Sequence, residues 1–561
     1  MKNFRWQILI ILLTGIIVGI LLITQQPDKT PVGAQPQSGG VYTEGLIGSI
    51  QRLNPLFDQY NQPDRDVNRL IFNGLIKFDS QGNPQPDLAQ SWGFSKDGLT
   101  YNFAINENIK WQDGSPFTMD DVIFTIEKMR EADSILPTDL KTFWQDIKLN
   151  KLNEFNLQFI LPEPFSPFLD YLTFGILPEH ILGEMSFKEI QDSPFNLQPV
   201  GTGPYKIDHL ILENSKVTGI VLAANKDYFA DKPFIDQVVF KYYPTSVEMF
   251  TAYSDGEIQG ISRVPADQLS SVLNDPKMAT YTGRRPELAM VLLNLKDTKV
   301  DFFQDVDVRQ ALMESINRSI IINQIFHGQA IQADSPIFPG TWAYYSGSSI
   351  TFDVDSAENH LKKAEFTFGA TADNIRSKEG KQLSFTLAYP DDDIHRQIAE
   401  SIQANWNEIG VEATLEPVSY ESLIGEKLVK RDFEAALVDI NLSRYPDPDP
   451  YPFWDQAQAT GGQNYSQWDN STASDYIEQA RIAIDRSERV RLYRNFQVVF
   501  REEMPALLLY YPVYTYAVDT SVKGVQMGPF YDPSDRLANI NKWYLLIKRG
   551  DQITTVTPGS N

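Results

Sequence analysis

Apolar and polar residues alternate in short runs over the first third of the chain, a pattern that predicts strands separated by turns. A short apolar run at 75–78 stops at a cluster of turn-forming residues. Asp97-Gly98 favours a two-residue hairpin. Residues 99–105 then alternate at period two, as in a half-buried strand. A helix is predicted from Thr118 onward, because apolar residues recur on one face after it.

Later in the chain, the pattern changes to strands that alternate with amphipathic helices. Residues 381–389 and 411–416 read as strands, and 391–409 between them reads as a helix ended by a glycine. This order implies a parallel pair with a right-handed crossover. A helix at 489–504 precedes a strand at 506–511. The residues expected to face inwards on two helices are Val308, Ala311, Leu312, Ile316 and Ile320 on one and Ile394, Ile398, Ile402, Trp406 and Ile409 on the other.

The N-terminus carries an apolar run at 8–23, preceded by two positive charges. Extended over Trp6 and Thr24, the run is just long enough to cross the hydrocarbon layer of a membrane. The charges place the N-terminus in the cytoplasm. We therefore predict a membrane anchor at 1–25 and a flexible tether at 26–40, which is polar and rich in Pro and Gly. The alternative is a signal peptide cut after the small residues 32–34. Both interpretations place the rest of the chain outside the membrane.

Composition narrows the functional classes. The chain has 561 residues, 42% of them hydrophobic, which is ample for several packed domains. Its formal net charge is −24, so a nucleic-acid partner is not expected. The absence of cysteine excludes disulfides and thiolate metal sites. We predict no cofactor and no metal.

Five motifs in order within residues 74–122 carry a family resemblance. They are Gly74-Leu75, the Pro-x-Leu-Ala-x-Ser-Trp segment 86–92, the Asp-Gly-x-x-Tyr-x-Phe segment 97–103, the Trp-x-Asp-Gly-x-Pro segment 111–116, and Asp-Asp-Val at 120–122. This order resembles the signature of the family 5 solute-binding proteins of ABC importers, the dipeptide and oligopeptide group. Further similar segments extend the resemblance from about Val41 to about Gly524.

The resemblance implies an α/β fold with two lobes, the periplasmic-binding-protein-like fold of class II and cluster C type. It also implies an extra subdomain inserted in the first lobe. The N-terminal transmembrane helix predicted from the apolar run is expected to precede both lobes. The chain is expected to divide as follows. The first lobe comprises residues 41–65, 198–290 and 512–550, and its inserted subdomain comprises residues 66–197. The second lobe comprises residues 291–511, and residues 551–561 form a disordered tail.

Motifs for catalysis are missing from the sequence. The five histidines are scattered, none forms a His-Glu-x-x-His pair, and no Gly-x-Ser-x-Gly elbow occurs. The Gly-Thr-Gly-Pro-Tyr element 201–205 lacks the third glycine of a phosphate loop and reads as a tight turn. Acidic clusters such as Asp120-Asp121 and 391–393 are expected on a solvated face. We predict that the protein is not an enzyme. Two alternatives of other classes remain. One is a cell-surface hydrolase that uses two carboxylates from distant positions. The other is a sensory ectodomain.

Two loops are the candidates for ligand contact that the resemblance implies. In peptide-binding members, the loop after Leu-Asn-Pro lines the cleft, and here it comprises Gln59, Tyr60, Asn61 and Gln62. The alternative for these residues is an ordinary exposed loop. The second loop precedes an Asp-Pro pair and comprises Leu442, Ser443, Arg444 and Tyr445.

In peptide binders, an acidic residue three positions before that Asp-Pro pair holds the ligand's amino terminus. Here the position falls on Arg444 or Pro446, depending on which of two Asp-Pro pairs is aligned, and neither residue is acidic. A guanidinium attracts a carboxylate or phosphate instead of an ammonium. A ligand with an anionic end is therefore expected if Arg444 faces the cleft. The alternative is that Arg444 pairs with Asp447 or Asp449 and shapes the loop.

The sequence therefore predicts a monomeric, membrane-tethered, extracytoplasmic solute-binding protein. Peptides are the expected ligands and the permease subunits of an ABC importer the expected partners. Oligosaccharides or other small solutes are the alternative ligands within the same fold.

Overall fold

The structure, a computed structural model, describes residues 38–79, 82–131, 143–347, 349–368, 374–442, 446–528 and 530–546. Within these ranges, no helix is both long and apolar enough to cross a membrane. The predicted anchor at 1–25, most of the predicted tether and the predicted tail at 551–561 lie outside the described residues.

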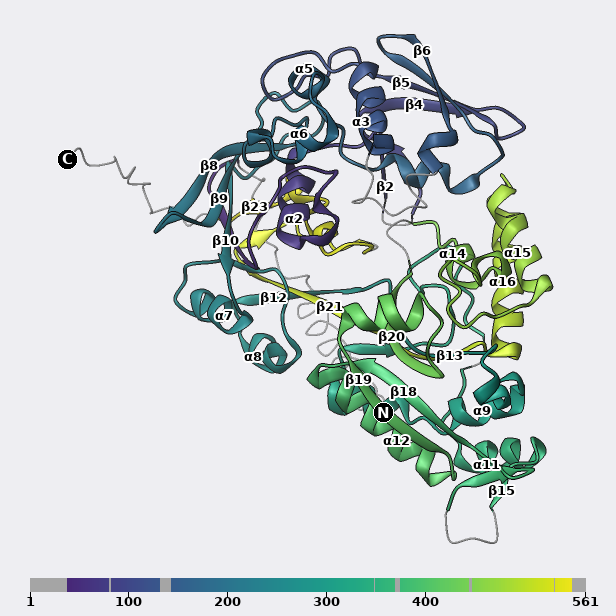
Figure 1. Ribbon diagram of the computed structural model, residues 1–561. Coiled ribbons are helices and arrows are strands. Elements are labelled where there is room, and N and C mark those ends of the chain that lie inside the picture. Colours follow the sequence, from purple (N-terminus) through teal and green to yellow (C-terminus); the bar gives the residue numbers. More distant parts are fainter. Residues whose placement is uncertain are drawn as a thin grey trace, which may run out of the picture.

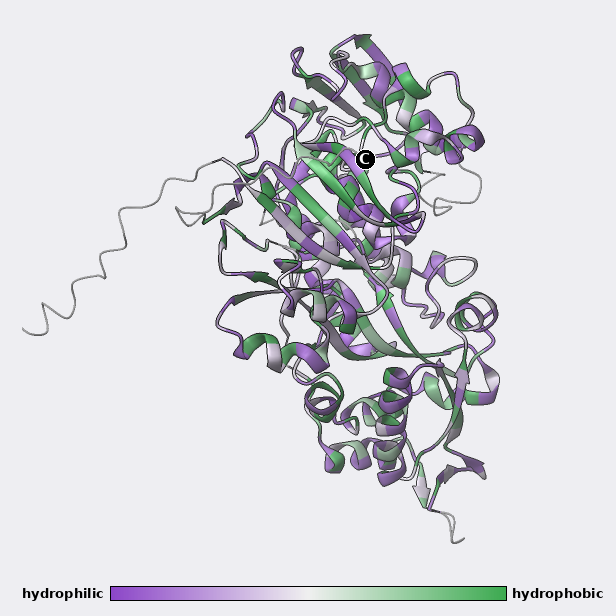
Figure 2. Cartoon of the chain, turned by 90° about the vertical axis from the view of Figure 1, so that its left-hand side faces the viewer, coloured by the Kyte–Doolittle hydropathy of each residue, from purple (hydrophilic) through white to green (hydrophobic). Residues whose placement is uncertain are grey.

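One long sheet runs through the molecule in the order β19-β18-β20-β13-β21-β11-β1-β10-β9-β8, and β12 and β14 also pair with β21 (Figure 1). Apolar and polar residues alternate along many of its strands, as expected where one face is buried (Figure 2). The strands are β1 (Val41–Ile47), β8 (Tyr205–Glu213), β9 (Lys216–Ala224), β10 (Gln237–Tyr243), β11 (Gly260–Ile261), β12 (Met278–Arg284), β13 (Glu287–Leu293), β14 (Ala330–Gln332), β18 (Ser384–Pro390), β19 (Glu412–Val418), β20 (Ala435–Asn441) and β21 (Ala506–Asp519).

Strand β21 is longer than the sequence pattern predicts, because it continues past Tyr511 to Asp519. Its first part pairs with β13, and its second part, from Val513 onward, pairs with β12. Pro512 has no N–H to donate, but its carbonyl accepts a hydrogen bond from the Arg285 main chain at 3.1 Å, so the strand is not interrupted. The chain therefore crosses between the two halves of the sheet twice, along β21 and along β12–β13.

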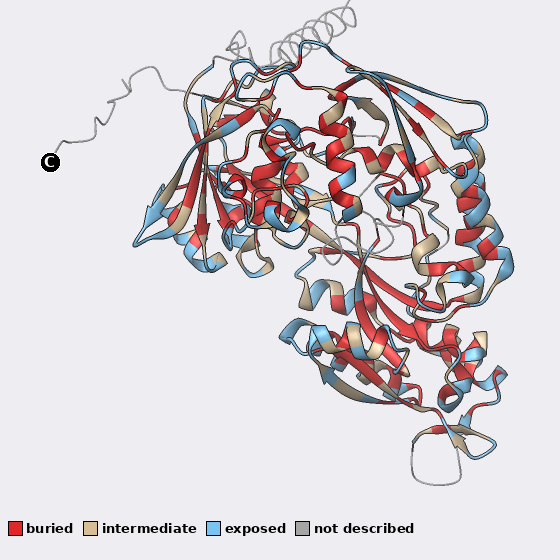
Figure 3. Ribbon diagram, turned by 45° about the horizontal axis from the view of Figure 1, so that its top comes forward, coloured by how far each residue is buried: buried red, intermediate tan, exposed pale blue. Residues whose placement is uncertain are grey.

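Two large apolar cores lie on either side of these crossings (Figure 3). One core contains buried residues from Tyr42 to Tyr242 and from Tyr514 to Trp543, and we call this part the first lobe. The other contains buried residues from Leu288 to Tyr511, and we call it the second lobe. The residue boundaries predicted for the lobes and the inserted subdomain stay predictions.

A separate antiparallel sheet in the order β4-β5-β7-β6 shares the core of the first lobe. Its strands are β4 (Ala89–Phe94), β5 (Thr100–Ile105), β6 (Lys148–Asn153) and β7 (Asn156–Ile160), and the small sheets contain β2 (Ile76–Phe78), β3 (Pro84–Pro86), β15 (Thr367–Phe368), β16 (Arg376–Lys378), β17 (Lys381–Gln382), β22 (Val522–Lys523) and β23 (Tyr544–Leu545). The predicted hairpin at Asp97-Gly98 joins β4 to β5. We call this sheet and α3 behind it the small-sheet region.

The helices cover the faces of these sheets. They are α2 (Gln62–Ile71), α3 (Met119–Glu131), α5 (Glu179–Leu182), α6 (Phe187–Gln191), α7 (Ser246–Ser254), α8 (Leu269–Asn274), α9 (Val306–Glu314), α10 (Arg318–Ile320), α11 (Val354–Lys363), α12 (Asp393–Glu408), α13 (Tyr420–Ser422), α14 (Tyr451–Trp454), α15 (Ser471–Ile482) and α16 (Arg486–Glu503). Three short 3-10 turns also matter below: η1 (Asp58–Tyr60), η2 (Ser166–Leu172) and η9 (Pro533–Leu537).

The β18–α12–β19 unit confirms the predicted strand, helix and parallel strand, because β18 and β19 pair in parallel. The inward stripe of α12 is wrong at one position, since Ile394 is 50% exposed. Ile394 lies in the first turn of α12, beyond the carboxyl end of β18, where the sheet does not cover it. The predicted 308–320 helix is also too long. It ends at Glu314, because Asn317 caps a new helix, and Ile320 is exposed.

Two local features of the first lobe differ from the sequence interpretation. The expectation of a solvated face is wrong for Asp121, which is buried and accepts hydrogen bonds from the main-chain N–H groups of Thr118 and Glu179, both at 2.9 Å. The tight turn at 201–205 is explained by close packing on the end of α2. A Cβ atom on Gly201 would lie 1.9 Å from the carbonyl oxygen of Ile71, so only glycine fits there.

The C-terminal segment is tied to the first lobe by a buried arginine. Arg536 of η9 is fully buried and binds two carboxylates, those of Glu44 on β1 (2.6 Å) and Asp66 on α2 (2.8 Å). Two carboxylates around one guanidinium satisfy its planar fork of donors. This contact joins residues that are more than 450 positions apart and fixes α2 against the C-terminal segment.

Candidate ligand-binding site

The first predicted contact loop lies in η1 and at the start of α2. The helix α2 begins at Gln62, so the last of the four predicted loop residues is helical. Tyr60 is 79% exposed and projects from the surface. Asn61 donates to the carboxylate of Asp64 at 2.9 Å, and Gln62 donates to that of Asp66 at 2.8 Å. The amide groups of Asn61 and Gln62 are therefore engaged within the first lobe, and Tyr60 is the most accessible of these side chains.

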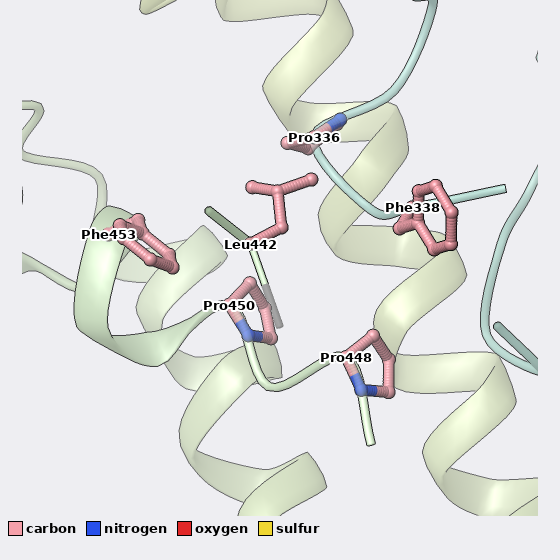
Figure 4. Close-up of a pocket in the computed structure, with 6 residues that line it drawn as sticks. All are labelled: Pro336, Phe338, Leu442, Pro448, Pro450 and Phe453. Atoms are coloured by element: carbon pink, nitrogen blue, oxygen red, sulfur yellow. The ribbon is translucent and has the colours of Figure 1, made fainter. Parts of the chain in front are cut away.

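Only one residue of the second predicted loop is described. Leu442 is buried at the end of β20, and its side chain lies in a narrow apolar pocket of the second lobe (Figure 4). The other residues that line this pocket are Pro336, Phe338, Pro448, Pro450 and Phe453. Ser443, Arg444 and Tyr445 lie outside the described residues, so the two interpretations of Arg444 stay predictions. Among the described residues, no hydrogen bond or ion pair joins Gln59–Gln62 to Leu442.

A polar cluster that the sequence analysis missed lies at the carboxyl ends of the parallel strands β18, β19 and β20. His395, in the first turn of α12, contacts two carboxylates. Its Nδ1 lies 2.6 Å from Asp392, which caps α12, and its Nε2 lies 3.1 Å from Asp439 on β20. In open α/β sheets, ligands bind in the crevice outside the carboxyl ends of the strands. The acidic run 391–393 is exposed, as the sequence predicts, and Asp392 in addition contacts His395.

The same edge of the sheet carries further charged and aromatic groups. Glu287 begins β13 and lies opposite Asn441, the last residue of β20. Arg285, two residues earlier, forms an ion pair with Glu287. Tyr420 follows β19 and is 63% exposed. We call Arg285, Glu287, Asp392, His395, Tyr420 and Asp439 the edge cluster. Because β21 and β12–β13 leave the second lobe at this edge, the edge cluster faces the first lobe.

Burial and neighbouring charges shift the pKa values in the edge cluster. Burial lowers the pKa of His395, but the hydrogen bonds and charges of Asp439 and Asp392 outweigh it, so the pKa is raised overall. Burial raises the pKa of Glu287, Asp439 raises it further, and Arg285 partly opposes both. With His395 protonated, the edge cluster holds charges of both signs in a small region.

The edge cluster is not arranged as a metal site. Both ring nitrogens of His395 face carboxylates instead of an open position. In the part of the chain that the structure describes, no group of three or more His, Asp and Glu side chains could hold a metal ion. The chemistry available is recognition of charged and hydrogen-bonding groups.

A contact between Asp447 and Asp170 joins the second lobe to the first at a distance in sequence of 277 residues. The main-chain N–H of Asp447 in the second lobe donates to the carboxylate of Asp170 in η2 at 2.9 Å. Arg489 of α16 forms two hydrogen bonds with the Asp447 carboxylate. Burial raises the pKa of Asp170, and the nearby charge of Asp447 raises it further. Arg486 of α16 donates to Asn83 at 2.6 Å beside this contact. Loop 446–450 therefore binds the first lobe through Asp447 and also lines the apolar pocket.

Signals for the edge cluster were present in the sequence but dispersed. Its residues come from four segments between positions 285 and 439, and only the strand–helix–strand prediction for 381–416 indicated that their ends meet. The two predicted loops came from the resemblance, which marks positions and not side-chain contacts.

Comparisons with known proteins confirm the resemblance. The sequence model of the bacterial extracellular solute-binding proteins, family 5, middle region, matches residues 83–463. The oligopeptide-binding protein AppA of Bacillus subtilis (strain 168) is 28% identical over 525 residues, which cover 91% of this chain and 92% of AppA. The dipeptide-binding protein of Escherichia coli (strain K12) is 27% identical over 486 residues, which cover 82% of this chain and 87% of that protein.

The fold of the chain also agrees with that of a solved family member. The structure of AppA from Bacillus subtilis in complex with a nonapeptide aligns with a TM-score of 0.69 and 27% identity, covering 91% of this chain and 100% of AppA. The family model spans more than half of the 561 residues. The chain belongs to the bacterial extracellular solute-binding proteins, family 5.

Proposed function

We propose that this protein binds peptides in the cleft between its two lobes and delivers them to the permease subunits of an ABC importer. The observation that carries the proposal is the edge cluster, which presents charges of both signs where the second lobe faces the first. A peptide with free ends offers an ammonium and a carboxylate, and charge-assisted hydrogen bonds to such groups are strong. The oligopeptide and dipeptide ligands in the names of the relatives support this class.

Capture requires that the lobes move, and the crossing strands supply a hinge. Pro286 and Pro512 lie at the crossings, and neither has an N–H to donate to the sheet. The pairing of β13 with β21 also shifts register between Ala289 and Met290. Two residues that cannot donate ladder hydrogen bonds lie at the crossings, and we therefore propose that the sheet bends there. Closure about a hinge over a ligand is an established motion of two-lobe binding proteins.

The finer features of the proposal concern the setting of the protein. We propose that residues 1–25 anchor the chain in the cell membrane and that 26–40 tether a monomeric extracytoplasmic domain. The fold is proposed to be of class II and cluster C type, with residues 66–197, which contain the small-sheet region, as the insertion in the first lobe. The protein releases its ligand unchanged. An oligosaccharide or another small solute is the alternative ligand, and a cell-surface hydrolase the alternative of another class.

The test is native mass spectrometry of the freshly purified full chain, which weighs whatever small molecule copurifies. We expect adducts with peptide masses that disappear on mild unfolding. Incubation with peptide and glycan mixtures should then raise the melting temperature without new products. A ligand at a hundred times its dissociation constant stabilises by about 2.7 kcal/mol. Binding of glycans alone supports the alternative ligand, and reproducible turnover supports the hydrolase.

A matched pair of variants ties the binding to the edge cluster. Asp439→Asn removes one of the two carboxylates on His395 and is expected to weaken peptide binding. Asp469→Asn is the control, because Asp469 is exposed and pairs with Lys296, which follows the opposite end of β13. Equal binding by both variants would argue against the edge cluster as the site.

A further inference from the structure

The lobes touch at a place well away from the crossing strands, where η2 of the first lobe meets loop 446–450 and the connection between α15 and α16 (Figure 1). The main-chain N–H of Asp447 donates to the carboxylate of Asp170 at 2.9 Å. Beside it, the hydroxyl of Ser166 donates to the carbonyl of Ala483. Because the crossings and this contact lie apart, the lobes cannot swing open about the crossings without breaking the contact.

This contact buries two carboxylates and only one guanidinium. Asp170 is 6% exposed, and the side chains of Asp447 and Arg489 are 5% and 7% exposed. Arg489 donates two hydrogen bonds to the Asp447 carboxylate, which compensates its charge. In the described part of the chain, no cation forms an ion pair with Asp170. With both acids ionised, the contact therefore buries one negative charge in excess, which is costly away from water.

The other groups around Asp170 do not supply the missing positive charge. Arg481 of α15 pairs with Asp449, the next acid of the loop, at 3.0 Å. Arg486 of α16 donates to a side-chain amide of the first lobe. On the side of the C-terminal segment, burial raises the pKa of Tyr531 and the charge of Asp170 raises it further, so this phenol stays neutral. Burial also raises the pKa of the two remaining tyrosines beside Asp447 and Arg489, which are Tyr101 and Tyr493.

A proton on Asp170 relieves the excess charge without breaking the contact. Burial raises the pKa of Asp170 well above 3.8, and the charge of Asp447 raises it further, whereas the hydrogen bond from Asp447 and the charge of Arg489 oppose the rise only in part. The protonated acid keeps a carbonyl oxygen that still accepts from the N–H of Asp447. When the lobes part, Asp170 returns to water and to its ordinary pKa. The closed state therefore binds this proton more tightly than the open state.

We infer that Asp170 is a proton-dependent latch between the lobes, which holds η2 against loop 446–450 when protonated and lets the lobes part when ionised. The contribution of this proton to closure is complete below pH 3.8, where Asp170 is protonated in both states. It is lost as the pH rises through the raised pKa of the closed state. The inference shares with the proposed function the movement of the lobes, but it does not depend on the ligand.

The test follows the distance between the lobes by fluorescence energy transfer in the full chain. The sequence has no cysteine, so one dye can be attached in each lobe at Leu152→Cys on β6 and Val498→Cys on α16, which replace exposed side chains. Energy transfer is measured between pH 5 and 8 without added peptide, and native mass spectrometry checks that no small molecule is bound. The labelled parent is compared with Asp170→Asn and Asp170→Ala. Asp146→Asn is the matched control, because Asp146 is an exposed acid just before β6. Melting temperatures check that each variant folds.

We expect the closed-to-open ratio of the labelled parent to fall as the pH rises, by at most about tenfold per pH unit, which is the limit for one proton. Asp170→Asn is uncharged and keeps an acceptor for the N–H of Asp447, so it should stay closed over the whole range. Asp170→Ala lacks the acceptor and should be more open than Asp170→Asn at every pH. Asp146→Asn should follow the parent.

Two results overturn the inference. A parent whose energy transfer does not change with pH has no proton-dependent latch. An Asp170→Asn variant that titrates like the parent assigns the pH dependence to another group. Neither result affects the proposed function, which fails only if the chain binds no peptide in the separate binding experiment.

Discussion

Replacing Arg489 with methionine is expected to weaken the contact between the second lobe and the first. Its side chain is 7% exposed and donates to the carboxylate of Asp447 at 2.6 and 3.0 Å. It also donates to the carbonyl of Ala480 at 2.7 Å and to the hydroxyl of Tyr493 at 3.1 Å. Because the main chain of Asp447 binds Asp170 of the first lobe, the pair lies directly at the junction.

The expected cost follows from burial. Removing one partner of a buried ion pair leaves the other charge desolvated, which costs about 3–5 kcal/mol. Methionine fills much of the volume of arginine, so lost packing adds little. The control is Arg491→Met on the same helix, whose partner Glu488 is at 2.5 Å but whose side chain is 57% exposed. An exposed pair of this kind contributes at most about 1 kcal/mol.

The assay is urea unfolding followed by both tryptophan fluorescence and circular dichroism, and free energies are compared where the two probes coincide. The double variant Arg489→Met with Asp447→Asn should recover part of the loss, since it removes the buried charge as well. The reasoning is refuted if Arg489→Met costs no more than Arg491→Met, or if the double variant is less stable than the single one.

Three further predictions concern pH, packing and the N-terminus. Burial raises the pKa of Asp58 from 3.8 to about 7, so its contribution to stability is complete below pH 3.8 and is lost as the pH rises through 7. Between pH 5 and 8, the melting temperature of the wild type should therefore fall more than that of Asp58→Asn. Gly201→Ala should destabilise by about 1–3 kcal/mol or more in urea unfolding, because its Cβ would meet the main chain of α2. Gly93→Ala, with open space around it, is the control and should have little effect. Intact-mass analysis of the membrane fraction should show Met1 or Lys2 as the first residue, and a chain that starts at Gln35 would contradict the predicted anchor.

The sequence by itself determined the elements whose signals are local. The period-two strand at 99–105 and the strand–helix–strand unit at 381–416 were predictable, because each is written in the spacing of neighbouring apolar residues. The five ordered motifs gave the family. Local spacing also explains the two residues that were wrongly predicted to face inwards. Ile394 and Ile320 continue an apolar stripe, but the first lies past the end of the sheet and the second past a helix break.

Only the tertiary structure decided which distant residues meet. Nothing in the pattern at 506–511 indicates that β21 continues into the other lobe. Pro512 follows this run, and a proline, which cannot donate a ladder hydrogen bond, argues against a continuing strand. The strand continues because the carbonyl of Pro512 accepts a hydrogen bond from Arg285. The edge cluster joins Arg285 and Glu287 to Asp392, His395, Tyr420 and Asp439, which come from four separate segments of the chain. Such contacts depend on the order and direction of strands in the sheet, whereas periodicity reports only which face of an element is buried.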